Sequence, residues 1–92
     1  MSITLRQMQY AIALAETGHF GRAAERCNVT QPALSQQIRQ LEDRCGANLF
    51  DRLGRSVRLT PLGHEFIARA RPIVERSDEL ADFVSGQRGH KT

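Results

Sequence analysis

The chain has 92 residues, of which 40% are hydrophobic, and this is enough for one small domain with a modest core. Its formal net charge of +3 comes entirely from residues 1–60, which hold eight Arg and five acidic residues. The sequence contains no long apolar run and no basic leader segment, so we expect neither a membrane protein nor an exported one. Two cysteines are too few for a disulfide framework, which agrees with a cytoplasmic protein.

The first part of the chain predicts two helices joined by short turns. Thr4 followed by Gln7 is a capping-box pattern, and apolar residues then recur at helical spacing until Gly18 ends the helix. A short helix is predicted over 21–27, where an Ala-Ala pair permits a close helix crossing. Residues 28–29 form a tight turn before the next helix. This order of helix, turn and helix is typical of a helix-turn-helix unit.

The segment 30–46 predicts the helix on which the rest of the chain depends. Thr30 is a good N-cap and Pro32 suits the first turn. One narrow apolar stripe runs along it: Leu34, Ile38, Leu41 and Cys45. The opposite arc carries amides, a guanidinium and a flanking hydroxyl, with acids only in its second half: Pro32, Ser35, Gln36, Arg39, Gln40 and Asp43. Such groups hydrogen-bond base edges, but a solvated amphipathic helix remains the alternative.

After Gly46 the pattern predicts two short strands, 49–52 and 57–59, joined by a Gly-containing loop at 53–56. Three cations fall within seven residues of this hairpin: Arg52, Arg55 and Arg58. A basic hairpin directly after a helix-turn-helix is a wing, placed to reach phosphates or a minor groove. The sequence therefore predicts a mainly α winged helix-turn-helix domain over residues 1–60.

Thr60 and Pro61 repeat the helix-start pattern and begin a long helix, predicted over 61–85. Large and small residues alternate along a heptad seam that fits another helix: Phe66, Ala70, Ile73, Ser77, Leu80 and Val84. The alternative is that this helix folds back on its own domain. A helix of about 37 Å is too long for a domain this small, which favours a homodimer. Residues 86–92 lack periodicity and are interpreted as a flexible tail or truncated linker.

With these motifs in place, the chain resembles the N-terminal DNA-binding domain of LysR-type transcriptional regulators. The shared pattern covers about residues 5–63, in correctly ordered fragments: FGRAAE at 20–25, VTQPALSQQIRQLE at 29–42, CGANLFDR at 45–52 and VRLTPLG at 57–63. The resemblance implies a bacterial winged helix-turn-helix that binds double-stranded DNA and dimerises through the linker helix on an interrupted palindrome.

The resemblance also implies which residues contact DNA. The family's contact positions match Gln31, Pro32, Ser35, Gln36, Arg39, Arg52 and Arg55, beside the Thr30 cap. Three residues depart from the family pattern: His19 where Ser is usual, and Cys27 and Cys45 where Leu is common. The first departure leaves open what caps the second helix. A small-molecule effector and a higher oligomer are expected only with the family's C-terminal domain, which this chain does not include.

Other chemistries find little support in the sequence. No combination of the cysteines with His19, His64 or His90 has zinc-ligand spacing, and both cysteines occupy apolar positions, so we expect no metal or cofactor. No carboxylate pair or nucleophile with a nearby base is apparent, so we expect no enzyme. The remaining rival is a winged helix that binds protein through its polar helix face.

Overall fold

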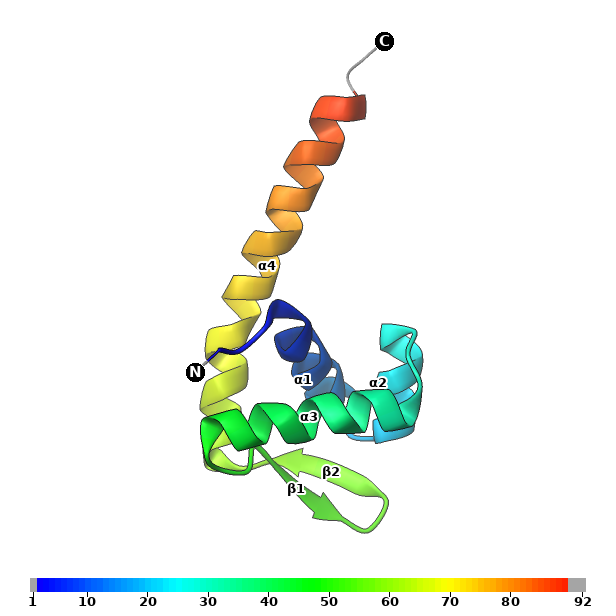
Figure 1. Ribbon diagram of the computed structural model, residues 1–92, viewed down its shortest axis with the longest axis vertical. Coiled ribbons are helices and arrows are strands. Elements are labelled where there is room, and N and C mark those ends of the chain that lie inside the picture. Colours follow the sequence, from blue (N-terminus) through cyan, green and yellow to red (C-terminus); the bar gives the residue numbers. More distant parts are fainter. Residues whose placement is uncertain (1, 90–92) are drawn as a thin grey trace.

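The computed structural model describes residues 2–89, which form a helical body, a two-stranded hairpin and one projecting helix (Figure 1). The elements in chain order are α1 (Leu5–Thr17), α2 (Phe20–Cys27), α3 (Gln31–Cys45), β1 (Phe50–Leu53), β2 (Ser56–Leu59) and α4 (Pro61–Gly89). The predicted winged helix-turn-helix followed by a long helix is confirmed. The second helix begins one residue earlier than predicted, because His19 rather than Phe20 occupies the extended N-cap position.

Helices α1, α2 and α3 pack around one apolar core. The predicted capping box is present, since Thr4 Oγ1 accepts the Gln7 backbone N–H at 3.0 Å and Gln7 Oε1 accepts that of Thr4 at 3.1 Å. Gly18 ends α1 with φ of +73°, a conformation that glycine adopts without strain. The core is built mainly from apolar side chains of these helices: Ala11, Leu14, Ala23, Ala24, Leu34, Ile38 and Leu41.

Strands β1 and β2 form an antiparallel hairpin in which Phe50 pairs with Leu59 and Leu53 pairs with Ser56. Both strands are shifted or extended by one residue from the prediction, so the turn contains only Gly54 and Arg55. Gly54 has φ of +62°, which suits the first position of a tight hairpin turn. Phe50 and Val57 are buried against the helical core, and this contact fixes the hairpin to the body.

Helix α4 begins at the predicted cap, where Thr60 Oγ1 accepts the Gly63 backbone N–H at 2.9 Å. It runs to Gly89, so the predicted helix end near Ser85 is four residues too early, and the interpretation of the last residues as a flexible tail or truncated linker stays a prediction. Gly86 keeps a helical backbone and lacks the positive φ that ends α1 and α3, and one glycine costs a helix only about 1 kcal/mol. The rest of the predicted tail, 90–92, lies outside the described residues.

The long axis of the molecule follows α4, with extents of 53 × 26 × 19 Å. Figure 1 shows α3 and the hairpin at one end and the C-terminal half of α4 at the other. No helix within residues 2–89 combines the length and the apolar character needed to span a bilayer.

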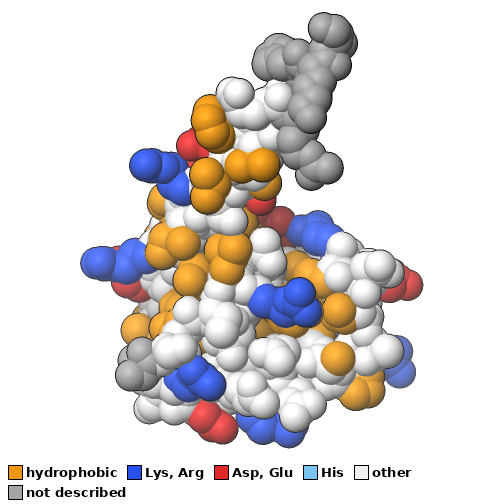
Figure 2. All heavy atoms as spheres, turned by 45° about the horizontal axis from the view of Figure 1, so that its top comes forward, with side chains coloured by type: hydrophobic (Ala, Val, Ile, Leu, Met, Phe, Trp, Pro, Cys, Tyr) orange, Lys and Arg blue, Asp and Glu red, His pale blue; other side chains and the backbone are white. Residues whose placement is uncertain are grey.

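Helix α4 carries two different apolar faces. The first is turned to its own domain and includes Gly63, Ile67 and Ala70, all buried. The second is exposed and continues along the projecting part, where hydrophobic side chains are visible in Figure 2. Its largest members, with their exposed fractions, are Leu62 (46%), Ile73 (50%), Leu80 (64%), Phe83 (61%) and Val84 (48%). A second surface must cover this face if it is not to remain in water.

Candidate nucleic-acid interface

The N-terminus of α3 is capped and free of acidic residues. Thr30 Oγ1 accepts the Ala33 backbone N–H at 3.3 Å, and Pro32 lies in the first turn, where its missing N–H has no helical partner to lose. The other first-turn N–H groups and the helix dipole make this end attractive to an anion such as a phosphate.

The two faces of α3 follow the predicted pattern. Leu34, Ile38 and Leu41 are buried, which turns the opposite face outward. Gln36 and Arg39 are exposed on that outward face, and Ser35 is half-buried on its edge. A guanidinium and an amide three residues apart can therefore reach the same neighbouring surface.

The arginines of the hairpin point in different directions. Arg55 lies in the turn and is exposed. Arg52 pairs with Val57, so its side chain shares the face that is turned to the helices, and its guanidinium lies 4.7 Å from the centre of the Phe20 ring. Arg58 pairs with Asp51 on the other face of the hairpin. The sequence position of Arg52 did not predict this contact with the Phe20 ring.

The turn between α1 and α2 holds the hairpin in place. The Gly18 carbonyl oxygen accepts the Val57 backbone N–H at 2.9 Å, and His19 Nδ1 lies 3.2 Å from the Arg55 carbonyl oxygen. With Phe20 under Arg52, three successive residues of this turn contact the hairpin. Sequence reasoning missed these contacts; the unusual histidine at position 19 was the only signal that could have suggested them.

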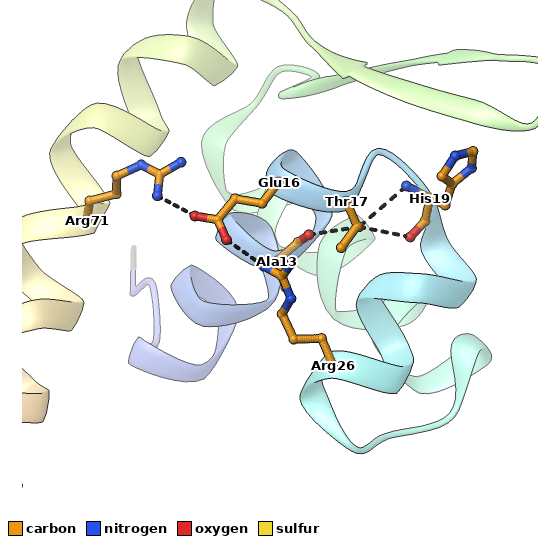
Figure 3. Close-up of polar contacts among 6 residues, drawn as sticks. All are labelled: Ala13, Glu16, Thr17, His19, Arg26 and Arg71. Atoms are coloured by element: carbon orange, nitrogen blue, oxygen red, sulfur yellow. Dashed lines mark hydrogen bonds and ion pairs between the residues drawn. The ribbon is translucent and has the colours of Figure 1, made fainter.

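The N-terminus of α2 has no side-chain cap from His19, whose ring is turned to the hairpin. Thr17 organises the junction instead, as Figure 3 shows. Its Oγ1 lies 2.8 Å from the Ala13 carbonyl oxygen and 3.2 Å from that of His19, and it accepts the His19 backbone N–H at 3.5 Å. His19 thus contacts the hairpin, and Thr17, two residues earlier, makes the hydrogen bonds at the junction between α1 and α2.

An open groove of about 590 Å³ separates α3 from β1, and Arg39 and Arg52 both line it. Asp43 and Asp51 line it as well, so its charge is mixed and it is no simple phosphate pocket. Glu42 also lines this groove and has a structural role, because its Oε2 accepts the backbone N–H groups of Leu49 and Phe50 at 2.8 and 3.1 Å. The contact joins the end of α3 to the start of the hairpin.

Both cysteines pack against the core as half-buried side chains, as predicted. Burial raises the pKa of the Cys27 thiol, partly offset by Arg26, and burial together with the Glu42 charge raises that of Cys45. Raised pKa values disfavour the reactive thiolate. Within residues 2–89, no cluster of three or more His, Cys, Asp or Glu side chains could hold a metal ion.

The structure brings most of the predicted DNA-contacting residues to one end of the molecule. Exposed there are Thr30, Gln31, Pro32, Gln36, Arg39, Arg52 and Arg55. The predicted dimerisation residues are divided. Ile73, Leu80 and Val84 are exposed, whereas Phe66 and Ser77 are half-buried. Ala70 is only 3% exposed, so the single chain already covers it and leaves it little surface for a partner, while the predicted dimerisation role of this seam stays a prediction.

Comparison with known proteins places this arrangement in a family. The profile described as "Bacterial regulatory helix-turn-helix protein, lysR family" matches residues 5–64. The chain is 51% identical over 81 residues to the uncharacterized HTH-type transcriptional regulator YnfL of Escherichia coli K12, covering 88% of this chain but only 27% of YnfL.

Two solved structures resemble the whole domain. The CbnR DNA-binding domain in a DNA complex has a TM-score of 0.82 and 36% identity, covering 94% of this chain and 99% of that one. The BenM DNA-binding domain in complex with catB site 1 DNA has a TM-score of 0.85 and 31% identity, covering 98% of this chain and 100% of that one.

Proposed function

This chain belongs to the lysR family of bacterial regulatory helix-turn-helix proteins, and we propose that it binds double-stranded DNA through α3 and the β1–β2 hairpin. The observation that carries the proposal is the exposed, acid-free first half of α3 beside the hairpin arginines. Likeness to the CbnR and BenM domains, whose structures contain DNA, supports it. The role is sequence-specific binding rather than catalysis, in the bacterial cytoplasm, as part of a transcriptional regulator.

In this proposal α3 lies in a major groove and reads base edges. Gln36 and Arg39 occupy its outward face, where an amide pairs with adenine and a guanidinium with guanine. Each such pair discriminates against a wrong base by about 1–3 kcal/mol. Ser35 lies at the edge of that face, and its shorter side chain contacts the DNA there.

The remaining contacts position the domain on the DNA backbone. The capped N-terminus of α3, with Thr30 and Gln31, faces a phosphate. Arg55 in the hairpin turn reaches phosphate or a minor-groove edge, and Arg52 does so from its place over the Phe20 ring. These contacts supply affinity that depends on salt and little sequence information.

The exposed face of α4 forms the homodimer contact in this proposal. Leu62, Phe66, Ile73, Leu80 and Val84 fall within a narrow arc of the helix when 100° is counted per residue. Covering their exposed surface with a second α4 removes apolar area from water, which is the main driving force for association.

An antiparallel pair of α4 helices fits this arc best. With Ile73 at the two-fold axis, Phe66 lies opposite the partner's Leu80 and Leu62 lies opposite the partner's Val84. The bulky helical bodies then stand at opposite ends of the pair, where they do not collide. Two recognition helices related by a two-fold axis match an interrupted palindrome.

The decisive experiment compares base reading with backbone positioning. Arg39→Ala, Arg55→Ala and the control Arg6→Ala each remove one positive charge, and Arg6 lies away from the hairpin, in a groove beside Val74 of α4. Each variant is titrated against a selected duplex and a scrambled duplex at several salt concentrations. The selected duplex comes from a random library bound by the parent.

Arg39→Ala should lose discrimination at one position per half-site, whereas Arg55→Ala should weaken both duplexes and reduce the salt slope by about one. Arg6→Ala should leave the discrimination between the duplexes unchanged. Equal loss on both duplexes for Arg39→Ala would mean that α3 grips phosphate only. A parent protein with no salt-dependent duplex binding would refute the proposal and favour a protein-binding module.

A further inference from the structure

Glu16 joins three helices of the domain. It lies in the last turn of α1, and Figure 3 shows its carboxylate between two arginines from different elements. Oε1 accepts from Arg26 Nη1 of α2 at 2.5 Å, and Oε2 accepts from Arg71 Nη1 of α4 at 2.5 Å. One carboxylate thus connects the helix-turn-helix to the long helix.

Arg71 lies just after the last buried contacts of α4 with the body, near the point where the helix begins to project. The buried contacts of α4 with its own domain, made by Gly63, Ile67 and Ala70, all precede it. Beyond it, through residue 87, only Val74 and Ser77 are half-buried and the other side chains are exposed. Among the side chains described through residue 87, the ion pair with Glu16 is therefore the last polar contact that α4 makes with the body.

The next residue weakens the helix at the same point. Pro72 lies inside α4 and has no backbone N–H, so it cannot donate the helical hydrogen bond to the Ala68 carbonyl. Proline in a helix interior favours bending there. Helix α4 can therefore bend at Pro72, and the neighbouring ion pair between Glu16 and Arg71 can hold the helix in one direction relative to the body.

We propose that Glu16 is a positioning residue that fixes the direction of α4 relative to the helix-turn-helix, and so the spacing of the two half-sites that a dimer binds. This inference rests on the proposed DNA-binding dimer. It assigns to Glu16 no contact with DNA and no part in the dimer seam.

The geometry converts a small change in direction into a measurable change in spacing. The 18 residues that follow Arg71 in α4 span about 27 Å, and the molecule is 53 Å long. The recognition end therefore lies roughly 25 Å beyond Arg71 on the other side. A tilt of about 10° moves it by about 4 Å, close to the 3.4 Å step between base pairs.

The DNA test varies the spacing between two half-sites. The parent should prefer one spacing, and a change of two base pairs should weaken its binding. In Glu16→Ala and Arg71→Ala this penalty should shrink by about two- to fivefold, the range expected when exposed ion pairs are lost. Arg26→Ala breaks only the tie to α2 and should keep the parent's preference. Affinity for an isolated half-site should change by less than about twofold in all three variants.

A matched control separates this effect from the change in charge. Glu65→Ala removes one carboxylate, as Glu16→Ala does, but Glu65 pairs with Arg69 within α4 itself at 2.6 Å. It should keep the parent's spacing preference. If it broadens the preference as much as Glu16→Ala, net charge explains the result and the inference fails.

A second measurement needs no DNA. Residual dipolar couplings from α1–α3 and from α4 beyond Arg71 should fit one alignment tensor in the parent. In Glu16→Ala and Arg71→Ala, α1–α3 and α4 should need two different tensors, while the couplings within α1–α3 still fit one. One common tensor in both variants would overturn the inference. A parent that binds no duplex would overturn the proposed function instead, and the couplings would still decide the role of Glu16.

Discussion

Gly63→Ala tests how closely α4 approaches the hairpin. A Cβ atom on Gly63 would overlap the Leu49 carbonyl oxygen and lie 2.9 Å from Leu59 Cδ2. That carbonyl also accepts the Thr60 backbone N–H at 3.0 Å, just before α4 begins. Because the obstacle is backbone on a buried residue, no side-chain rotation can relieve it, and α4 or the hairpin must move.

The expected cost follows from three terms. Overpacking a close contact costs about 1–3 kcal/mol, and weakening the Thr60 to Leu49 hydrogen bond adds about 1 kcal/mol. Replacing a helical glycine by alanine returns about 0.5–1 kcal/mol. We expect Gly63→Ala to lower the free energy of unfolding by about 2 kcal/mol, which lowers Tm by roughly 8–16 °C for a domain of this size.

Gly86→Ala is the matched control, since it lies in the same helix and nothing lies within 4 Å of its added Cβ. It should be neutral or raise the unfolding free energy by up to about 1 kcal/mol. Urea unfolding of both variants at one protein concentration gives the comparison, because a dimer's stability depends on concentration. If Gly63→Ala unfolds within about 0.5 kcal/mol of the parent, the close approach of α4 to Leu49 is wrong.

Three further predictions concern the dimer, the cysteines and acid. Asp at both Ile73 and Leu80 places charges in the apolar seam and should give monomers by light scattering, whereas an unchanged mass excludes this face. The double Ala variant of Cys27 and Cys45 should lose stability by urea unfolding but bind DNA alike under reducing and oxidising conditions; a redox effect confined to the parent contradicts the packing role. The hydrogen bond from Arg71, opposed by partial burial and aided by Arg26, lowers the pKa of Glu16. The free energy of unfolding of the parent should exceed that of Glu16→Gln by its full amount above glutamate's ordinary pKa of about 4.3, and this difference should disappear as the pH falls through the lowered pKa. A difference that does not change with pH would show that the charge of Glu16 is not its source.

The parts of the fold that sequence predicted are those set by local rules. Thr4 with Gln7, Thr30, and Gly46 mark helix ends through contacts within a few residues, so their sequence neighbours contain the needed information. The outward face of α3 was predicted for a related reason. Once the apolar stripe is buried, helical geometry turns Gln36 outward whatever surrounds it.

In helix α4, the periodic pattern of apolar residues was not sufficient to predict which surface covers each face. Its small and large apolar residues recur every seven positions, and this pattern predicts one seam. In the structure, Gly63 and Ala70 are buried within their own domain while Ile73 and Leu80 face outward. Periodicity shows which residues share a face but not which surface covers them, because that depends on elements far away in the sequence.

The same distinction separates the two halves of the candidate interface. The face of α3 follows from one helix, whereas the hairpin is placed by contacts such as that of His19 with Arg55, 36 residues away. The position of its arginines therefore depends on the α1–α2 turn. If α3 reads bases and the hairpin contacts the DNA backbone as proposed, a change at position 19 should alter the backbone contacts and leave the base preference of α3 unchanged. Affinity and base preference would then depend on different elements of this domain.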